Sequence, residues 1–527
     1  MTIVPNSDII LLKTPFEMDE RNQLTFSSKQ AQYNYFSSLP KLAYDKCTYQ
    51  RKDGVIRYTT EPTGLTYEDL LEYNYCMYQN EAYDNKWFYA YIENIEYKND
   101  GMSEVKIKTD SFQTWQFDIE YKRSFVEREH VNNDTIGLHT IPEQLEYGEY
   151  INAKDKTDFN YTEICFIVIA TTEMYEKNKE RPASIYNGIY GGLVYNIFKA
   201  VNSANAFLSN LDEAGRGDIV NSVFLIPSAM ALSTMVDSWT FSRKNVDYLF
   251  YTLKESWSAV DFGVIKITRP THVGKSYTPK NNKLFCWPYN SLIVSNNSGM
   301  SGEYHYENFD SLSSITFQVF GAISPGCSIK AIPRNYKNVI LNVEESLNGA
   351  KLPTCSWNTD VYTNWLTQNS VNFAMSDVKS GANILIGALT LNGGAIVNGV
   401  SGVAEKQAQI YEHSFTPNQA RGNVNSGDVT FTTGNADFNV YYMTIKDEYA
   451  KIIDNFFTMF GYKVNDTKIP NITGRRNWNY VKTVDINITG NFPQADLQEI
   501  KDMFNNGCTF WHNPSTFLDY SQSNNIV

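Results

Sequence analysis

A glycine followed by lysine and serine is the feature of this chain that most resembles a phosphate-binding site. Gly274-Lys275-Ser276 matches the end of the loop pattern G-x-x-x-x-G-K-S, in which backbone N–H groups and the lysine bind phosphate oxygens. The full pattern requires glycine at position 269, where this chain has Arg269. The spacing therefore excludes a nucleotide-binding loop of this type.

Carboxylates and histidines offer two further kinds of chemistry, acid–base catalysis and metal binding. Glu127 and Glu129 stand two apart in a predicted strand, a spacing at which two carboxylates share one face. This spacing is also typical of a solvated strand face, and we expect no catalysis there. The histidines lie at positions 130, 139, 272, 305, 413 and 512. They show no HExxH or HxxH spacing and no G-x-S-x-G elbow is present, so we predict no metal, no cofactor and no enzymatic activity.

Seven cysteines are scattered along the chain without a CxxC pair. Their odd number and wide spacing argue against a disulfide framework or a zinc site. We expect reduced, mostly buried thiols, which fits assembly in a reducing cytoplasm. The N-terminal residues lack the basic start and long apolar core of a signal peptide.

Composition sets the fold class. The chain has 527 residues with 45 Lys and Arg against 58 Asp and Glu, so its net charge is 45 − 58 = −13, which argues against a general polyanion-binding protein. Apolar residues make up 42% and charged residues 20%, enough for large cores. Because Tyr (36) and Phe (30) are both abundant and favour strands, we predict a mainly β, multidomain chain with minor α content.

Local patterns predict particular strands. Residues 87–97 and 104–109 read as strands, and Asn99-Asp100-Gly101 between them is a strong hairpin turn. Further strands are predicted over 124–131, 163–171, 478–484 and 485–490.

Helices are predicted at fewer places. Residues 64–80 could hold a short helix, and a longer one is predicted near 193–213. Residues 446–460 form a helix candidate that Gly461 would end, and residues 494–505 form another, closed by Gly507.

A weak internal echo suggests a duplicated β subdomain. Residues 85–88 (NKWF) are matched by residues 282–285 (NKLF), and the turn at 99–103 is matched by residues 297–301. Chance similarity between two hairpins explains the echo equally well. If the chain formed a ring, two similar subdomains per subunit would give the ring wall a pseudo-symmetry of twice the number of subunits.

The segment between Lys379 and Glu405 contains no charged residue over 25 positions. A helix of that length would measure about 37 Å, enough to cross a hydrocarbon core of about 30 Å. Glycines disfavour such a helix at about 1 kcal/mol each, so we read Asn392-Gly393-Gly394 as a turn between two apolar arms. The window resembles fusion or pore-forming peptides, but it also fits a core hairpin or a glycine-rich subunit interface. The residues that would form the turn and supply flexibility are Gly387, Asn392, Gly393, Gly394, Gly399 and Gly402.

Several ordered blocks resemble the distal tail-knob proteins of small, short-tailed, picovirus-type phages of Gram-positive bacteria. They are NKWFYA at 85–90, QTWQFDI at 113–119, EREHV at 127–131, FFTMFGYKVN at 456–465, WNYVKT at 478–483 and DLQEIKDMFNNGCTFWH at 496–512. The resemblance covers the first 150 and last 160 residues well and is weak over 150–280. The apolar window lies between these blocks, where the family has a long hydrophobic loop.

The resemblance implies a homohexameric β tube at the tail tip. Viral double-stranded DNA would pass through it during ejection without sequence-specific binding, and the protein would be assembled in the host cytoplasm and carried in the virion. Six hydrophobic loops would plug the lumen and then insert in the host cytoplasmic membrane to help form a pore. Other partners would be collar or tail-tube proteins and a distal protein that degrades the cell wall. The loop maps to 371–430, and its membrane-interacting residues would be Ile384, Leu385, Ile386, Leu389, Leu391, Ile396, Val397, Val400 and Val403.

This interpretation divides the chain into five parts. They are an N-terminal tube subdomain at 1–150, an inserted domain at 151–280, a second tube subdomain at 281–370, the hydrophobic loop at 371–430 and a C-terminal α+β segment at 431–527. Two alternatives stay open: a carbohydrate-binding tail adhesin that uses Tyr and Trp of the inserted domain, and a cell-wall hydrolase, which the missing catalytic pattern disfavours.

Overall fold

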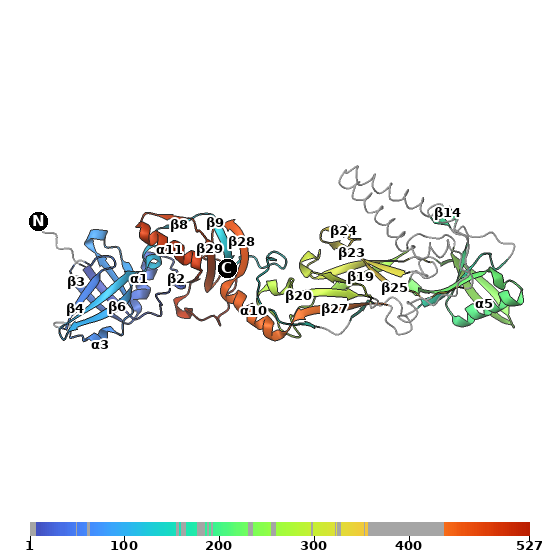
Figure 1. The fold of residues 1–527 in the computed structure, drawn as a ribbon, viewed down its shortest axis with the longest axis horizontal. Helices are drawn as coiled ribbons and strands as arrows, with labels where there is room; N and C mark the ends of the chain where they lie inside the picture. The colour runs from blue at the N-terminus through green and yellow to red at the C-terminus, as the bar shows by residue number, and fades with distance from the viewer. Residues whose placement is uncertain are drawn as a thin grey trace, which may run out of the picture. The chain divides into compact units, whose positions relative to one another are not determined.

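The fold is mainly β, as predicted (Figure 1). The chain divides into two compact units. The first unit comprises residues 1–146, 279–283 and 451–527, and the second comprises 147–278 and 284–450. The computed structural model describes residues 7–48, 50–60, 64–153, 157–159, 165–176, 185–186, 189–190, 193–229, 235–253, 260–296, 299–321, 323, 328–352, 354–356 and 437–527.

An antiparallel six-stranded sheet forms the N-terminal part of the first unit. Its strand order is β3 (Lys41–Cys47), β1 (Ser7–Leu12), β5 (Tyr75–Asn80), β6 (Phe88–Asn99), β7 (Met102–Thr109) and β4 (Val55–Thr59). The predicted hairpin is confirmed, since β6 pairs with β7 and Asn99 pairs with Met102 across the turn. Helix α1 (Lys29–Ser38) begins at Ser28, whose side chain accepts a hydrogen bond from the Ala31 N–H.

The predicted helix within 64–80 is much shorter than that window. A capping box between Thr66 and Asp69 starts helix α3 (Tyr67–Leu70), and the chain then turns into strand β5. Tyr75–Asn80 is strand because it pairs with β1 on one side and β6 on the other, burying Tyr75, Cys76, Met77 and Tyr78.

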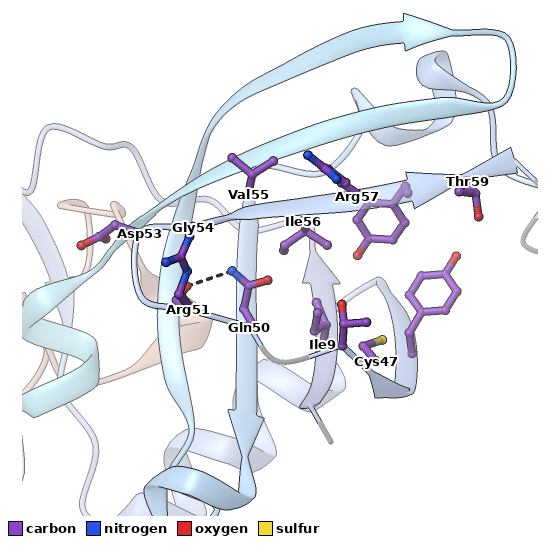
Figure 2. A pocket seen from close by; sticks show the side chains of 13 residues that line it. Ile9, Cys47, Gln50, Arg51, Asp53, Gly54, Val55, Ile56, Arg57 and Thr59 are labelled. Carbon is purple, nitrogen blue, oxygen red and sulfur yellow. Dashed lines mark hydrogen bonds between the residues drawn. The ribbon is translucent and has the colours of Figure 1, made fainter. Parts of the chain in front are cut away.

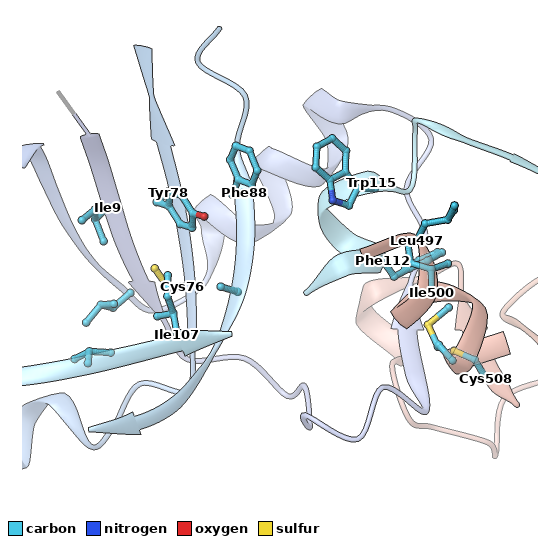
Figure 3. Close-up of a cluster of buried hydrophobic side chains, with 14 of the residues drawn as sticks. Ile9, Cys76, Tyr78, Phe88, Ile107, Phe112, Trp115, Leu497, Ile500 and Cys508 are labelled. Atoms are coloured by element: carbon cyan, nitrogen blue, oxygen red, sulfur yellow. The ribbon is translucent and has the colours of Figure 1, made fainter. Parts of the chain in front are cut away.

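The second sheet of the first unit joins both ends of the chain. Its order is β2 (Asn22–Leu24), β31 (Cys508–Trp511), β29 (Trp478–Val484), β9 (Ser124–Glu129) and β28 (Tyr462–Lys468). A short pair of β8 (Ile119–Tyr121) and β30 (Ile488–Gly490) and the helices α4 (Ser111–Trp115) and α11 (Gln494–Asn506) complete it. One core spans both parts, with Ile9, Cys76 and Ile107 on the strand side and Phe112, Leu497 and Ile500 on the helices (Figure 3).

Two sheets of the second unit share another core. The first has the order β10 (Tyr150–Asn152), β27 (Phe438–Ile445), β20 (Asn290–Ser295) and β21 (Ser301–Tyr304), and β11 (Thr157–Phe159) also pairs with β27. The other has the order β19 (Val260–Thr268), β22 (Ser314–Gly321), β23 (Ser328–Tyr336) and β24 (Val339–Leu341), with β25 (Leu347–Lys351) on β23. Leu292 and Val440 from the first sheet pack with Phe317 and Ile329 from the other.

The remaining sheet of the second unit is covered by helix α5 (Val201–Glu213). Its order is β17 (Met235–Arg243), β18 (Val246–Leu253), β15 (Val194–Phe198), β12 (Cys165–Thr171), β16 (Val220–Pro227) and β26 (Thr354–Ser356), and a separate short pair is β13 (Ile185–Tyr186) with β14 (Ile189–Tyr190). The helix predicted near 193–213 therefore begins later, because residues 194–198 pair with β12 and β18. Phe207 of α5 lies 5.0 Å from Phe198 and 5.3 Å from Phe250, ring centre to ring centre.

Both predicted C-terminal helices are present. Helix α10 (Asp447–Phe460) ends before Gly461, whose φ is +64°, and α11 ends before Gly507, whose φ is +94°. The two copies of the sequence echo differ locally, because residues 85–88 turn directly into β6 whereas Asn282–Phe285 form a 3₁₀ helix. An antiparallel hairpin nonetheless follows each, β6 with β7 and β20 with β21.

Candidate functional site

The predicted hydrophobic loop, residues 371–430, lies outside the described residues, and so do all fifteen residues singled out within it. The structure describes the two strands that flank this part of the chain. On the N-terminal side, β26 pairs with β16, with Val223 opposite Cys355 and Phe224 opposite Thr354. The last described strand before the loop is therefore an edge strand of a six-stranded sheet.

On the C-terminal side, β27 is an interior strand. It pairs with β20 over six residues on one edge, and with β10 and β11 on the other. Phe438, Val440 and Ile445 are buried to 1% exposure or less. Because both edges are paired and its apolar face is buried, β27 is a firm attachment for the chain that precedes it.

The Gly274-Lys275-Ser276 tripeptide lies at the end of β27 and binds a carboxylate of the chain itself. The Lys275 N–H donates to Asp447 Oδ1 at 2.6 Å, and the Ser276 hydroxyl donates to Asp447 Oδ2 at 3.2 Å. Gly274 has φ +66°, and a Cβ there would stand 1.8 Å from Asp447 Oδ1. The tripeptide thus fastens the start of α10, and two of the groups that would face phosphate in such a loop, the Lys275 N–H and the Ser276 hydroxyl, are bound to Asp447.

The two carboxylates of β9 do not form an acid–base pair. Glu127 Oε2 lies 2.9 Å from Lys482 Nζ, whereas the buried Glu129 pairs with Lys468 and accepts from the Asn471 N–H at 2.9 Å. Each carboxylate therefore pairs with a different lysine, as in ion pairs that stabilise a fold.

The described histidines also have structural partners. His130 is buried, receives the Tyr480 N–H on Nδ1 at 2.8 Å and lies 3.0 Å from the Thr458 carbonyl through Nε2. Burial lowers its pKa to about 3, so it is neutral over the physiological range. Burial likewise lowers the pKa of His512 to about 4. Among the described residues, no group of three or more His, Cys, Asp or Glu is arranged to hold a metal ion, and His413 lies outside them.

A buried ion cluster in the first unit was not foreseen from the sequence. Glu143 has a fully buried side chain that pairs with both Arg128 and Lys283 and accepts from the Lys463 N–H at 2.9 Å. The Lys283 side chain is 3% exposed and the Arg128 side chain 12%. Because these partners are 15 to 320 residues apart, no local pattern marks the cluster.

A cavity of about 650 Å³ lies beside β3 and β4 (Figure 2). Gln50, Arg51, Asp53 and Arg57 are among the polar residues that line it, and the Gln50 amide donates to the Arg51 carbonyl at 2.9 Å. Burial raises the pKa of Cys47 at this cavity, which keeps the thiol protonated. The lining contains polar recognition groups but no nucleophile paired with a base.

A second cavity in the first unit, of about 530 Å³, is rich in carboxylates. Asp19, Glu20, Glu499 and Asp502 line it together with Lys108. Burial raises the pKa of Glu20 to about 7, and the neighbouring Asp110 adds to the rise. The Glu20 carboxyl at this cavity therefore changes its protonation state near neutral pH.

Two further predictions concern membranes and sugars. None of the helices in the described part of the chain is long and apolar enough to cross a membrane. Within the described part of 151–280, Trp239 is half-buried and its indole N–H donates to Thr252 Oγ1 at 2.8 Å. Among the residues of 151–280 whose exposure the structure describes, no Phe, Trp or Tyr side chain is exposed, and Tyr150 just before them is 40% exposed.

Comparisons with known proteins identify the family. Residues 250–525 match the family model described as Bacillus phage phi29 tail knob protein gp9, C-terminal domain, and residues 5–121 match the caudoviral major tail protein N-terminus. The chain is 26% identical to tail knob protein gp9 of Bacillus phage PZA, over 95% of this chain and 96% of that protein. It is also 26% identical to tail knob protein gp9 of Bacillus phage phi29, over 98% of each.

A solved structure supports the same fold. The tail knob protein gp12 of bacteriophage C1 superposes with a TM-score of 0.69 at 16% identity, over 99% of this chain and 100% of that one. The tail knob family model alone spans more than half of the chain. The chain therefore belongs to the family of phage tail knob proteins, structural components of short phage tails.

Proposed function

We propose that this chain forms a homohexameric tube at the tail tip that conducts viral double-stranded DNA during ejection. The hydrophobic loop, residues 371–430, plugs the lumen in the resting virion and inserts in the host cytoplasmic membrane on infection. The protein acts without catalysis, and it contacts collar or tail-tube proteins and a distal cell-wall-degrading protein. Around the loop, residues 1–150, 281–370 and 431–527 complete the tube wall and 151–280 lie at its periphery or distal end.

The observation that carries this proposal is the placement of an uncharged segment between two fixed strands. The segment has no charged residue from 380 to 404, and the strands before and after it, β26 and β27, are both paired within the second unit. A long insertion between fixed ends can change its position without unfolding the sheets that hold it. Because the chain belongs to the tail knob family, we expect the insertion to act at the phage tail.

Hydrophobic free energy favours two alternative positions for the loop. Nine large apolar side chains at about 1.5–3 kcal/mol each correspond to about 13–27 kcal/mol per loop when they leave water. Contact with other loops in a closed lumen and contact with lipid both supply this gain. Since the two states are then close in energy, DNA pressure or a receptor can shift the balance between them.

The acidic character of the chain suits DNA passage. Lys and Arg contacts with phosphates dominate the affinity of proteins for DNA, and the net charge of −13 opposes such contacts. A wall that binds DNA weakly does not hold it during transit.

Dye release from anionic liposomes tests the membrane step. We compare the intact protein with a variant that lacks residues 380–404 and with the double substitution Leu389→Asp and Val397→Asp. Leakage by the intact protein that both variants lose supports the proposal, whereas equal leakage by all three refutes it. The control places aspartate at the exposed Leu138 and Leu249, 55% and 44% exposed, and should leak like the intact protein.

Native mass spectrometry tests the assembly separately. Six copies of the 60.2 kDa chain are expected in the assembled species. A stable species of another stoichiometry would refute the hexameric tube while leaving the membrane activity of the loop to the liposome result.

A further inference from the structure

A group of aromatic and carboxylate side chains lies at the surface of the second unit, on strand β10 beside β27, on β21, and on the segments that precede β20 and follow β21. We call it the Trp287 cluster, and it consists of Tyr147, Tyr150, Trp287, Glu303, His305 and Glu307. Trp287 is 42% exposed and Tyr150 is 40% exposed. Large rings at the surface forgo the gain of about 1.5–3 kcal/mol that burial gives a large apolar side chain, so adjacent exposed rings often mark a binding surface.

The rings are held in fixed positions. Trp287 stacks on His305, with ring centres 5.5 Å apart and planes 24° from parallel, and its backbone N–H donates to Glu307 Oε2 at 3.2 Å. The Tyr150 hydroxyl donates to the Pro288 carbonyl at 2.7 Å, and its ring lies 5.5 Å from that of Tyr147. A surface fixed in this way loses little side-chain entropy when it binds a ligand.

Two carboxylates flank His305, the ring that stacks on the exposed indole of Trp287. Glu303 Oε1 lies 3.7 Å from His305 Nε2, and Glu307 Oε1 lies 3.8 Å from His305 Nδ1. The Glu303 side chain is 47% exposed, whereas that of Glu307 is 11% exposed. The accessible carboxylate of Glu303 therefore lies next to the His305 ring that stacks on the indole.

This chemistry fits a sugar ring. A pyranose has an apolar C–H face that stacks on an aromatic side chain, and a rim of hydroxyl donors that carboxylates accept. Phosphate polymers and anionic lipid surfaces would meet Glu303 and Glu307 with like charge, and so would the same face of a second copy. An uncharged ring with several donors meets no such repulsion.

We propose that the Trp287 cluster is a subsite for an uncharged pyranose unit of a glycan, with Trp287 as the stacking platform and Glu303 as a hydroxyl acceptor. This places glycan recognition at residues 287–307 and at Tyr147 and Tyr150, at the border of the inserted domain rather than within it. The inference does not depend on DNA conduction or on the hydrophobic loop.

Ligand-observed NMR and calorimetry with the full-length chain test the proposal, using chitotetraose and maltotetraose as neutral probes. We expect saturation transfer to at least one of them with a Kd of about 1 mM, the affinity of a small ligand with few contacts. Trp287→Ala should weaken this binding about tenfold or more, and Glu303→Gln should weaken it severalfold. Tyr97→Ala is the matched control, since Tyr97 is 51% exposed and lies in the first unit.

Several outcomes would overturn the proposal. One is the absence of saturation transfer from the intact chain to either probe, and another is unchanged affinity in Trp287→Ala. Tighter binding of poly(glycerol phosphate) than of both neutral probes would contradict the charge argument. Because Glu303 is at the surface, Glu303→Gln keeps the test valid if Trp287→Ala fails to fold. If Trp287→Ala changes the oligomeric state and leaves the sugar affinity intact, the cluster is a contact between copies.

Discussion

Glu143 is the carboxylate on which the buried ion cluster of the first unit depends, and Glu143→Gln should destabilise that unit by about 3–5 kcal/mol. The change is small in shape, because glutamine can still accept the Lys463 N–H that lies 2.9 Å from Glu143 Oε1. It removes the negative charge between Arg128 and Lys283, whose side chains are 12% and 3% exposed. Two buried cations would then face each other without the anion that holds them.

The magnitude follows from burial. Opposite charges about 4 Å apart attract by about 4 kcal/mol at an effective dielectric constant of about 20, and removal of one partner of a buried pair commonly costs about 3–5 kcal/mol. The matched control is Glu72→Gln, which removes the anion of the Lys13–Glu72 pair, where the side chains are 40% and 64% exposed. Solvent screens that pair, so its loss should cost about 0–1 kcal/mol.

Urea unfolding measures the difference, with hydrogen exchange of peptides from β28 and β29 assigning the transition to the first unit. A second substitution sharpens the test. Adding Lys283→Met to Glu143→Gln removes one of the two buried cations that Glu143 held, so the double variant should be more stable than Glu143→Gln alone. If Glu143→Gln costs no more than Glu72→Gln, or if the second substitution destabilises further, then the ion pairs do not hold this unit together.

Two other predictions concern stability. Gly461→Ala should lower the free energy of unfolding by about 2 kcal/mol or more, because φ is +64° and a Cβ would stand 2.1 Å from the Glu129 carbonyl oxygen. Gly64→Ala is the control, with φ +71° and no atom within 4 Å of the added Cβ, and it should lower that free energy by about 1 kcal/mol. Thermal unfolding measures both. Glu20→Gln should stabilise the first unit by about 1–3 kcal/mol above pH 7 and change little below pH 4.5. The folded-state pKa of about 7 exceeds the ordinary glutamate pKa of 4.5, so the intact chain loses stability as pH rises between these values. The difference between the two pH–stability curves isolates Glu20 from His130, whose lowered pKa acts in the opposite direction, and a flat difference curve would contradict the assignment.

Local sequence signals predicted several elements well. Asn99-Asp100-Gly101 marked the β6–β7 hairpin, Gly461 marked the end of α10, and residues 478–484 are strand β29 with the predicted bounds. Each signal acts over a few residues, through turn geometry, helix termination or alternating burial. The uncharged window of the predicted loop was likewise visible in the sequence. The absence of charged residues is a property of the residue types alone and does not depend on tertiary contacts.

Long-range pairing decided the rest. Residues 194–198 form strand β15 rather than helix because β12 and β18 lie on either side. The same kind of pairing places Asn22 beside Thr509 and so brings residues from the two ends of the chain into one sheet. Such contacts cannot be read from local periodicity, since the partner that stabilises them is tens to hundreds of residues away.

The sequence by itself determined that this chain is mainly β, that its ordered blocks resemble tail knob proteins, and where its uncharged segment lies. The tertiary structure decided which strands hold the chain on either side of that segment, which cations surround Glu143, and that Trp287 shares its surface with His305 and Glu303. The physical reason is that composition and short patterns fix the local preferences of the backbone. Charges and rings acquire partners only when segments distant in the sequence meet.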